Sequence, residues 1–276
     1  MGVGEFQDDF DAERANPRHE GYVVVTRGGS AGLACRNAPE FLSPFGPPVL
    51  QVSDEAAGWL HEAARNGTRA RLLACATRSP AVSYNVVASL PGRDPSLSPL
   101  VVMTPRSGWW QCAAERGGGI AGWIEVMRRL SGSDRARDVT LVATTGHELG
   151  LLGVHKFLSK REGLVKGAQA WIHFGASIGA AVGAGVRLGA SDGALASAAH
   201  AALQRQGAPN TPSAGEGAMV GAESNVVHAL GARCVAMAGG HAFFHMRSDR
   251  WPGAVKVADV AAYANAFADV AVEVAC

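Results

Sequence analysis

Residues capable of acid–base or metal chemistry follow the ends of apolar, strand-like segments. His147 and Glu148 lie in TTGHELGLLG, directly after the apolar run DVTLVATT. A His-Glu pair is typical of zinc proteases with the HExxH motif, in which two histidines four residues apart bind the metal. That motif fails here, because Leu151 holds the fourth position and His155, eight residues on, would lie on a different face of a helix. The pair therefore needs another explanation.

The elements that must position these residues alternate between strands and helices. Buried-strand patterns occupy residues 98–104, 138–145, 168–175 and 233–239, and helical spacing occupies residues 117–132, 151–163, 193–207 and 257–274. This alternation predicts an α/β fold with a mostly parallel sheet covered by helices on both faces. Ligands of such sheets bind beyond the carboxyl ends of the strands, which is where His147 and Glu148 stand.

A smaller α/β module is expected before this domain. Strand patterns occupy residues 21–26, 47–53 and 69–77, and a helical pattern occupies residues 54–67. We therefore divide the chain into a polar N-terminal tail (1–20), a small module (21–80) and the main domain (81–276). The segment GAGVRLG has the wrong glycine spacing for a dinucleotide-binding fingerprint and is given no role.

Composition excludes several classes of partner. The chain has 276 residues, 47% hydrophobic and 18% charged, with a net charge of +1 and no basic patch interleaved with aromatic residues, so we expect no nucleic acid. No secretory signal is visible, and the most apolar stretch, AWIHFGASIGAAVGAGV, is short of the roughly 20 residues that span a membrane. The five cysteines form no CxxC pair. We expect a soluble, cytoplasmic protein with no membrane contact.

From about residue 84 onward, the order of several segments resembles that of a known family. The segments are NVVASLPG, PLVVMTPRSGWW, ERGGGIAGWIEVMRRL, VTLVATTGHELGLLG, AWIHFG and FFHMRSD. In order and approximate spacing they are similar to the dinuclear zinc aminopeptidases, the group that includes the glutaminyl cyclases. Residues 21–80 resemble part of the protease-associated domain found in such enzymes. The resemblance implies a zinc aminopeptidase-like fold.

The resemblance also implies which residues stand at the metal site. Three positions keep a residue type that can bind metal: Glu115 at the bridging carboxylate, Glu148 at a carboxylate ligand and His245 at the last histidine ligand. With these three, each zinc would have two protein ligands. A catalytic zinc ordinarily takes three, so the resemblance implies a degenerate dinuclear site.

The other positions of the implied site have changed. Thr104 replaces a histidine ligand, Arg106 replaces the aspartate that orients it, and Gly175 replaces an aspartate ligand. His147 stands at the general-base position, where a near-neutral pKa suits acid–base work. His173 cannot supply the missing ligand, because two residues along a strand span about 6.5 Å.

Two carboxylates at one site repel each other unless a cation lies between them. Arg106 is the cation we expect between Glu115 and Glu148, because a guanidinium can bind two carboxylates, with Arg116 and His147 adding positive charge. A guanidinium–imidazole network would then replace the zinc ions. Two further residues near the same strand end are expected to line the pocket or to pack in the core, namely Trp109 and Trp110.

Three functions remain open on this basis. The first is an aminopeptidase-like pseudoenzyme, not a standard peptidase, that binds a small molecule or peptide in the old cleft. The second is a divergent single-metal hydrolase, a peptidase or amidase, using Glu115, Glu148 and His245 with His147 as base. The third is a structural or assembly protein, a homo-oligomer or a subunit bound to a partner protein. The first and third predict no cofactor, and the second predicts zinc.

Overall fold

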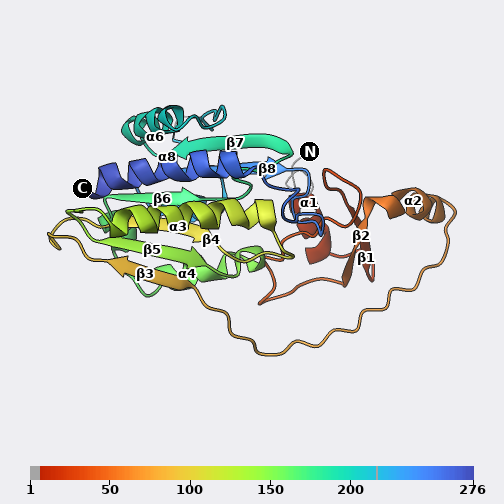
Figure 1. Cartoon of the computed structure of the whole chain (residues 1–276). Helices are drawn as coiled ribbons and strands as arrows, with labels where there is room; N and C mark the ends of the chain where they lie inside the picture. The colour runs from red at the N-terminus through yellow and green to blue at the C-terminus, as the bar shows by residue number, and fades with distance from the viewer. Residues whose placement is uncertain (1–6, 216) are drawn as a thin grey trace.

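The computed structural model describes residues 7–215 and 217–276. Its centre is a six-stranded sheet in the order β3-β5-β4-β6-β8-β7 (Figure 1). The four inner strands run parallel, while β3 and β7 pair antiparallel at the two edges. The strand bounds are β3 Val86–Leu90, β4 Leu100–Pro105, β5 Val139–Thr144, β6 Ala170–Phe174, β7 Gly183–Ala190 and β8 Cys234–His241.

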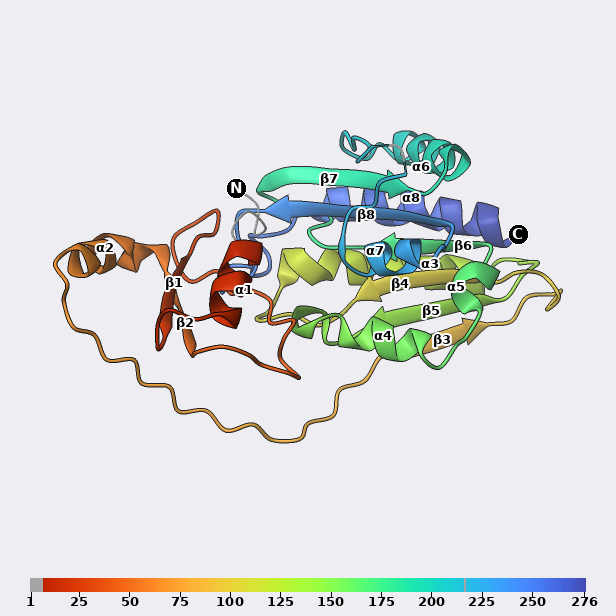
Figure 2. The same cartoon turned by 180° about the vertical axis from the view of Figure 1, so that it is seen from behind.

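Helices cover both faces of this sheet, as Figures 1 and 2 show from opposite sides. One face carries α3 (Gly118–Ser131) and α8 (Val257–Ala275), with α6 (Gly193–Arg205) packed on α8. The other face carries α4 (Leu152–Leu158), α5 (Leu164–Gly167) and α7 (Ala222–Ala229). The mostly parallel sheet with helices on both faces confirms the fold class predicted from the sequence.

The central strands are buried on both faces because successive side chains point in opposite directions. In β4, Leu100 and Val102 belong to the hydrophobic cluster under α3 and α8. Val101 and Met103 belong to the cluster under α4 and α7. All four are fully buried, so the carboxyl end of β4 is held between two packed layers. The residues that follow this end are therefore fixed in place.

A small N-terminal module precedes the sheet. It contains α1 (Gln7–Ala15), the parallel pair β1 (Tyr22–Thr26) and β2 (Val49–Ser53), a 3₁₀ turn η1 (Asp54–Ala56) and α2 (Ala57–Arg65). Helix α1 lies inside the segment predicted from the sequence as a polar tail. Its Arg14 pairs with Glu40 at 2.6 Å and donates to the Phe45 carbonyl oxygen, which holds the helix on the module.

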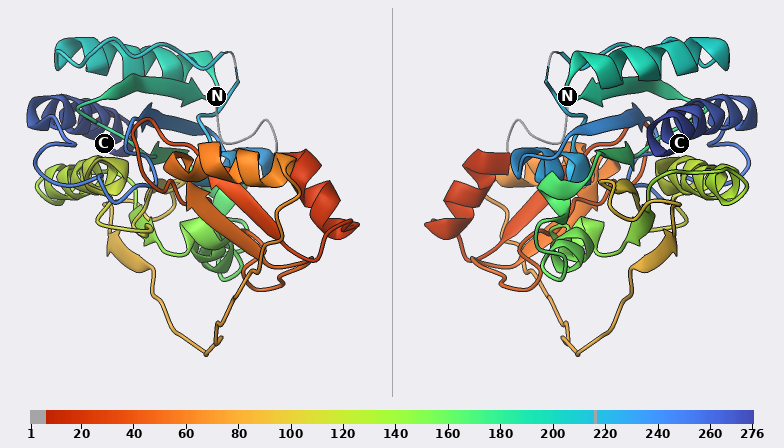
Figure 3. Two further views of the ribbon diagram at one scale, coloured as in Figure 1. Left: turned by 90° about the vertical axis from the view of Figure 1, so that its right-hand side faces the viewer. Right: turned by 90° about the vertical axis from the view of Figure 1, so that its left-hand side faces the viewer.

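Residues 66–85, which we call the arm, join this module to β3. The arm is irregular and mostly exposed, and it loops away from the body of the protein (Figures 1 and 3). The strand predicted at residues 69–77 is therefore wrong. No strand of the described residues pairs with this segment, and a strand needs a partner for its backbone hydrogen bonds. Within the described residues, no helix is long and apolar enough to cross a membrane.

Candidate functional site

Polar residues gather where β4, β5, β6 and β8 end, and the backbone around them is strained. Among residues 7–215 and 217–276, five residues other than glycine have a positive φ, and each of them lies within a few positions of a polar group of the site. They are Cys112, Leu151, Ser177, Ala222 and His245. A positive φ is uncommon outside glycine, and such strain gathers where the surrounding structure enforces one geometry. The positive φ angles at this edge of the sheet indicate that the surrounding structure holds the polar residues in one geometry.

A π-helical turn, η2 (Ala113–Gly117), carries two of the site's charges into the interior. Glu115 is fully buried and Arg116 is 3% exposed. Asp249 fixes the start of the turn, because its two carboxylate oxygens accept the backbone N–H groups of Ala114 at 2.7 Å and Glu115 at 2.9 Å. Single π-helical turns are often found at functional sites. This turn lets the neighbouring residues Glu115 and Arg116 both face the site.

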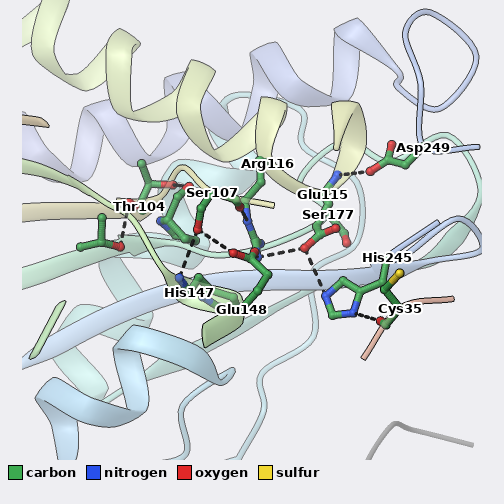
Figure 4. A network of polar contacts seen from close by, with 12 residues as sticks. Cys35, Thr104, Ser107, Glu115, Arg116, His147, Glu148, Ser177, His245 and Asp249 are labelled. Atoms are coloured by element: carbon green, nitrogen blue, oxygen red, sulfur yellow. Dashed lines mark hydrogen bonds and ion pairs between the residues drawn. The ribbon is translucent and has the colours of Figure 1, made fainter. Parts of the chain in front are cut away.

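Arg116 lies between the two carboxylates of the implied metal site (Figure 4). Its Nη2 atom is 2.8 Å from Glu148 Oε1 and 2.9 Å from Glu115 Oε1. Its Nε donates to the carbonyl oxygen of Ser107 at 2.6 Å. Burial opposes the charged form of Arg116, but the charges of Glu115 and Glu148 outweigh burial and raise its pKa. The guanidinium is therefore a permanent buried cation.

Arg106 does not take this place, which corrects the prediction. Its backbone N–H donates to the Thr144 carbonyl oxygen, and its exposed guanidinium donates to the Tyr84 carbonyl oxygen at 2.6 and 3.0 Å. The prediction of a guanidinium between Glu115 and Glu148 holds, but the residue that supplies it is Arg116. Arg106 instead ties the arm to the end of β4.

Ser107 connects Glu148 to the 3₁₀ turn η3 (His147–Leu149) that carries it. The Ser107 hydroxyl donates to Glu148 Oε2 at 2.6 Å and accepts the backbone N–H of His147 at 3.1 Å. Both carboxylate oxygens of Glu148 are thereby bound, one to Arg116 and the other to Ser107. Each carboxylate oxygen of Glu148 therefore already accepts a hydrogen bond.

His147 faces a second buried carboxylate, Glu223, at the start of α7. His147 Nδ1 is 3.1 Å from Glu223 Oε1, and His173 Nε2 is 3.5 Å from Glu223 Oε2. The Thr144 hydroxyl also donates to Glu223 Oε1, at 3.0 Å. Burial alone would raise the pKa of Glu223, but the contacts with His147 and His173 hold it well below its usual range. His147 is thus an oriented imidazole with an ionised partner.

His245 lies on the other side of Glu115. Its Nε2 atom is 3.3 Å from Glu115 Oε1, and its Nδ1 faces the carbonyl oxygen of Cys35 at 2.7 Å. Burial would raise the pKa of Glu115, but the His245 imidazole and the Arg116 charge outweigh it and lower the pKa to about 2. Glu115 is therefore an ionised, enclosed carboxylate.

Residues 28–39, which we call the strap, run across this edge of the sheet from the N-terminal module. Besides the Cys35–His245 contact, the Ala38 N–H donates to the Glu148 carbonyl oxygen at 2.7 Å and the Gly29 N–H donates to the Ala242 carbonyl oxygen at 2.9 Å. The polar centre beneath is closed, with Glu148 and His245 each 4% exposed. Ser107 and Glu148 nevertheless line a pocket that opens beside the strap.

The remaining predicted site residues are spread around this centre. Thr104 is buried and donates to the Phe174 carbonyl oxygen at 2.9 Å. Gly175 has no space for a side chain, because a Cβ there would lie 2.7 Å from Ala238 Cβ. Trp109 lines the pocket beside Ser107 and Glu148. Trp110 lies outside that pocket and donates to the His245 carbonyl oxygen at 3.2 Å.

The donor set does not fit the dinuclear zinc centre that the fold suggests. A guanidinium occupies the space between Glu115 and Glu148, and its positive charge would repel a metal ion there. The ligand atoms of Glu115, Glu148 and His245 do not converge on one point. In the described part of the chain, one group of three possible ligands does converge: the ligand atoms of Cys112, Glu115 and Asp249 lie within 4.8 Å of one another. Thiolate and carboxylate are ligand types that zinc accepts.

The fold of this protein is shared with a class of known structures. The architecture is that of the zinc aminopeptidases and glutaminyl cyclases, as the sequence resemblance predicted. A peptidase M28 precursor from Shewanella amazonensis is similar over 94% of this chain and 61% of its own, with a TM-score of 0.68 and 16% identity. The zinc aminopeptidase of Bacillus subtilis is similar over 67% of this chain and 49% of its own, with a TM-score of 0.57 and 16% sequence identity.

A glutaminyl cyclase from an Acidobacteriales bacterium is also similar, over 69% of this chain and 73% of its own, with a TM-score of 0.56 and 14% identity. The chain thus spans about half to three fifths of the length of the aminopeptidase and peptidase structures above. No protein-family profile and no curated protein matches the sequence. These similarities establish the fold.

Sequence reasoning missed two acidic residues of the site. Asp249 stands four residues after His245 in HMRSD, and this spacing within a short polar segment was a usable signal. Glu223 stands in GAESNVV after a long glycine-rich loop, and only the tertiary structure brings it to His147 and His173. His173, considered in the sequence analysis only as a metal ligand, is one of the two imidazoles that face Glu223.

Proposed function

We propose that this protein is an aminopeptidase-fold pseudoenzyme in which a buried guanidinium has replaced the zinc ions. It is not a standard peptidase, and it binds a ligand or partner through what remains open of the old cleft. The observation that carries the proposal is the position of Arg116 Nη2, 2.8 Å from Glu148 and 2.9 Å from Glu115. The permanent positive charge of Arg116 stabilises the Glu115 and Glu148 carboxylates, a role that two metal ions would otherwise have.

The chemistry of the centre supports a binding role. Peptide hydrolysis by two metals needs ions that hold water and polarise the scissile carbonyl. Here the carboxylates are engaged by Arg116 and Ser107, and the strap covers the centre. His147 keeps its orientation through Glu223, while the two carboxylate oxygens of Glu148 accept hydrogen bonds from Arg116 and Ser107. Substrate turnover would require rearrangement of the ion pairs.

Metal analysis and a peptidase assay test the proposal together. The purified protein is measured by inductively coupled plasma mass spectrometry, as isolated and after incubation with zinc followed by desalting, and is assayed with leucine p-nitroanilide. We expect far less than one equivalent of metal and no turnover in either state. About one or two equivalents of zinc together with turnover that EDTA abolishes would overturn the proposal.

A single-metal hydrolase is the second candidate, because Cys112, Glu115 and Asp249 converge. This set replaces the predicted set of Glu115, Glu148 and His245, and His147, oriented by Glu223, would be the base. Both Asp249 oxygens already accept backbone N–H groups, which weighs against the candidate. Loss of about one bound zinc in Cys112→Ser, with the fold retained by circular dichroism, would favour it.

The closed polar centre also supports a structural or assembly role, in which the protein acts as a homo-oligomer or a subunit of a larger complex. Light scattering coupled to size-exclusion chromatography measures the oligomer directly. The assignment of residues 21–80 to a protease-associated domain remains a prediction.

A further inference from the structure

The open part of the cleft is a pocket that extends away from the polar centre. Its volume is about 1460 Å³, and we call it the outer pocket. Ser107, Trp109 and Glu148 line its inner end, the arm lines one side, and α4 with the residues after it lines the other. Small-molecule sites usually enclose about 300–1,000 Å³. The size of the outer pocket therefore favours a peptide segment over a small ligand.

The outer pocket carries uncompensated positive charge. Its lining includes four cationic side chains: Arg78, Lys156, Lys160 and Arg161. Its one carboxylate is Glu148, which Arg116 and Ser107 already hold. Across residues 7–215 and 217–276, no carboxylate forms an ion pair with any of the four cations. This arrangement complements a ligand with several negative charges.

Aromatic rings hold two of these cations in place. The Arg161 guanidinium lies 4.1 Å from the centre of the Phe157 ring, and that of Arg78 lies 5.2 Å from the centre of the Phe41 ring. Each guanidinium also donates one N–H to the carbonyl oxygen of the same phenylalanine, and its remaining N–H groups can bind a carboxylate. The pocket thus offers apolar surface and positioned positive charge side by side.

A free strand edge begins beside the same pocket. β3 pairs with β5 on one side only, and its Val86 and Val87 are 48% and 40% exposed. Asn85, directly before β3, donates to the Gly153 carbonyl oxygen in α4 and accepts the Thr145 N–H, so this edge starts next to α4. An exposed edge accepts an extended peptide as an additional strand.

We propose that the outer pocket and the β3 edge bind an extended acidic peptide with apolar residues at alternate positions. The peptide pairs its backbone with β3, buries its apolar side chains against the pocket, and directs its carboxylates toward Lys156, Lys160 and Arg161. This inference rests on the proposed binding function and names its ligand class. It requires neither a metal ion nor turnover.

Fluorescence anisotropy tests the inference with a fluorescein-labelled twelve-residue peptide that alternates glutamate with valine and leucine. A matched peptide carries lysine in place of glutamate, and all titrations contain EDTA. We expect the acidic peptide to bind, with an affinity that falls as salt increases, and the basic peptide not to bind. Equal binding of both peptides, or of neither, would overturn the inference.

Charge-reversal variants locate the binding surface. We expect Lys156→Glu/Lys160→Glu to weaken binding at least about tenfold. The matched control Lys166→Glu/Lys256→Glu makes the same change of net charge at exposed lysines outside the pocket and should leave the affinity unchanged. Equal effects of the two double variants would contradict the assigned surface.

Hydrogen–deuterium exchange tests the predicted strand pairing. We expect the bound acidic peptide to slow amide exchange in residues 86–90, and unchanged exchange there would refute strand addition. Because EDTA is present throughout, zinc-dependent turnover in the separate peptidase assay would overturn the pseudoenzyme proposal without changing these binding results.

Discussion

Replacement of Arg116 by methionine removes the one cation that lies between Glu115 and Glu148 and preserves most of the side-chain volume. The two carboxylates that lose their partner are 0% and 4% exposed. Breaking a buried ion pair by removing one partner costs about 3–5 kcal/mol, because the remaining charge stays buried without compensation. About 4 kcal/mol corresponds to roughly a thousandfold change in the ratio of folded to unfolded protein.

Urea denaturation followed by circular dichroism at pH 7 measures this loss. Arg129→Met is the matched control, because Arg129 pairs with Asp269 at 2.7 Å, but its side chain is 34% exposed. A partly exposed pair contributes about 0–1 kcal/mol. We expect the midpoint of Arg116→Met to fall far below both the wild type and the control, with a similar denaturant slope.

A rescue variant keeps the test decisive if Arg116→Met unfolds completely. Arg116→Met/Glu148→Gln removes one of the two uncompensated charges and should recover about 1–2 kcal/mol of the lost stability. Our account of the centre is refuted if Arg116→Met and Arg129→Met lose equal stability, or if the double variant is no more stable than Arg116→Met.

Two further predictions concern Glu115 and the glycines that follow it. The pKa of Glu115 is lowered from 4.5 to about 2, so its stabilising contribution is complete above pH 4.5 and is lost as the pH falls toward 2. We expect protonation of Glu115 to lower the free energy of urea unfolding by about 3 kcal/mol over that range. Glu115→Gln should lack this part of the pH dependence. If the stability of Glu115→Gln depends on pH as that of the wild type does, the assignment of this pH dependence to Glu115 is contradicted. A Cβ at Gly118 would overlap the Ile178 carbonyl oxygen, whereas one at Gly117 meets nothing within 4 Å. Calorimetry should show Gly118→Ala destabilised by about 1–3 kcal/mol and Gly117→Ala close to the wild type, and equal melting temperatures would argue against the close approach at Gly118.

The regular elements were predictable where periodicity was strong. The apolar strands β4, β5, β6 and β8 and the amphipathic helix α3 were evident from the sequence because burial on both faces, or on one helical stripe, leaves a clear pattern. β7 was missed because GAGVRLGA is rich in glycine, and antiparallel pairing with β8 determines its conformation. The segment 69–77 shows the opposite case, in which a strand-like sequence has no partner.

The sequence predicted that the site lies at the ends of the strands, but it did not predict that Arg116 lies between Glu115 and Glu148. Arg106 was favoured because it stands where the resemblance places an aspartate beside the metal site, while Arg116 was expected only to add positive charge. The structure reverses this choice because the π-helical turn directs Arg116 inward beside Glu115, while Arg106 is turned toward the arm. Neither the wider turn nor the distant Asp249 that anchors it is encoded in local periodicity.

The strap reaches the site with main-chain atoms. The carbonyl oxygen of Cys35 faces His245, and the amide of Ala38 binds the Glu148 carbonyl oxygen. The side chains at these two positions take no part in either bond, whereas proline at either position would remove an N–H donor, because the Cys35 N–H also donates to the His245 carbonyl oxygen. The cover over the charged centre can therefore persist when the side chains at positions 35 and 38 change, whereas Gly29 has no room for a Cβ beside Ala242. Among related chains, the strap would be recognised by the path of its backbone and not by shared residues at positions 35 and 38.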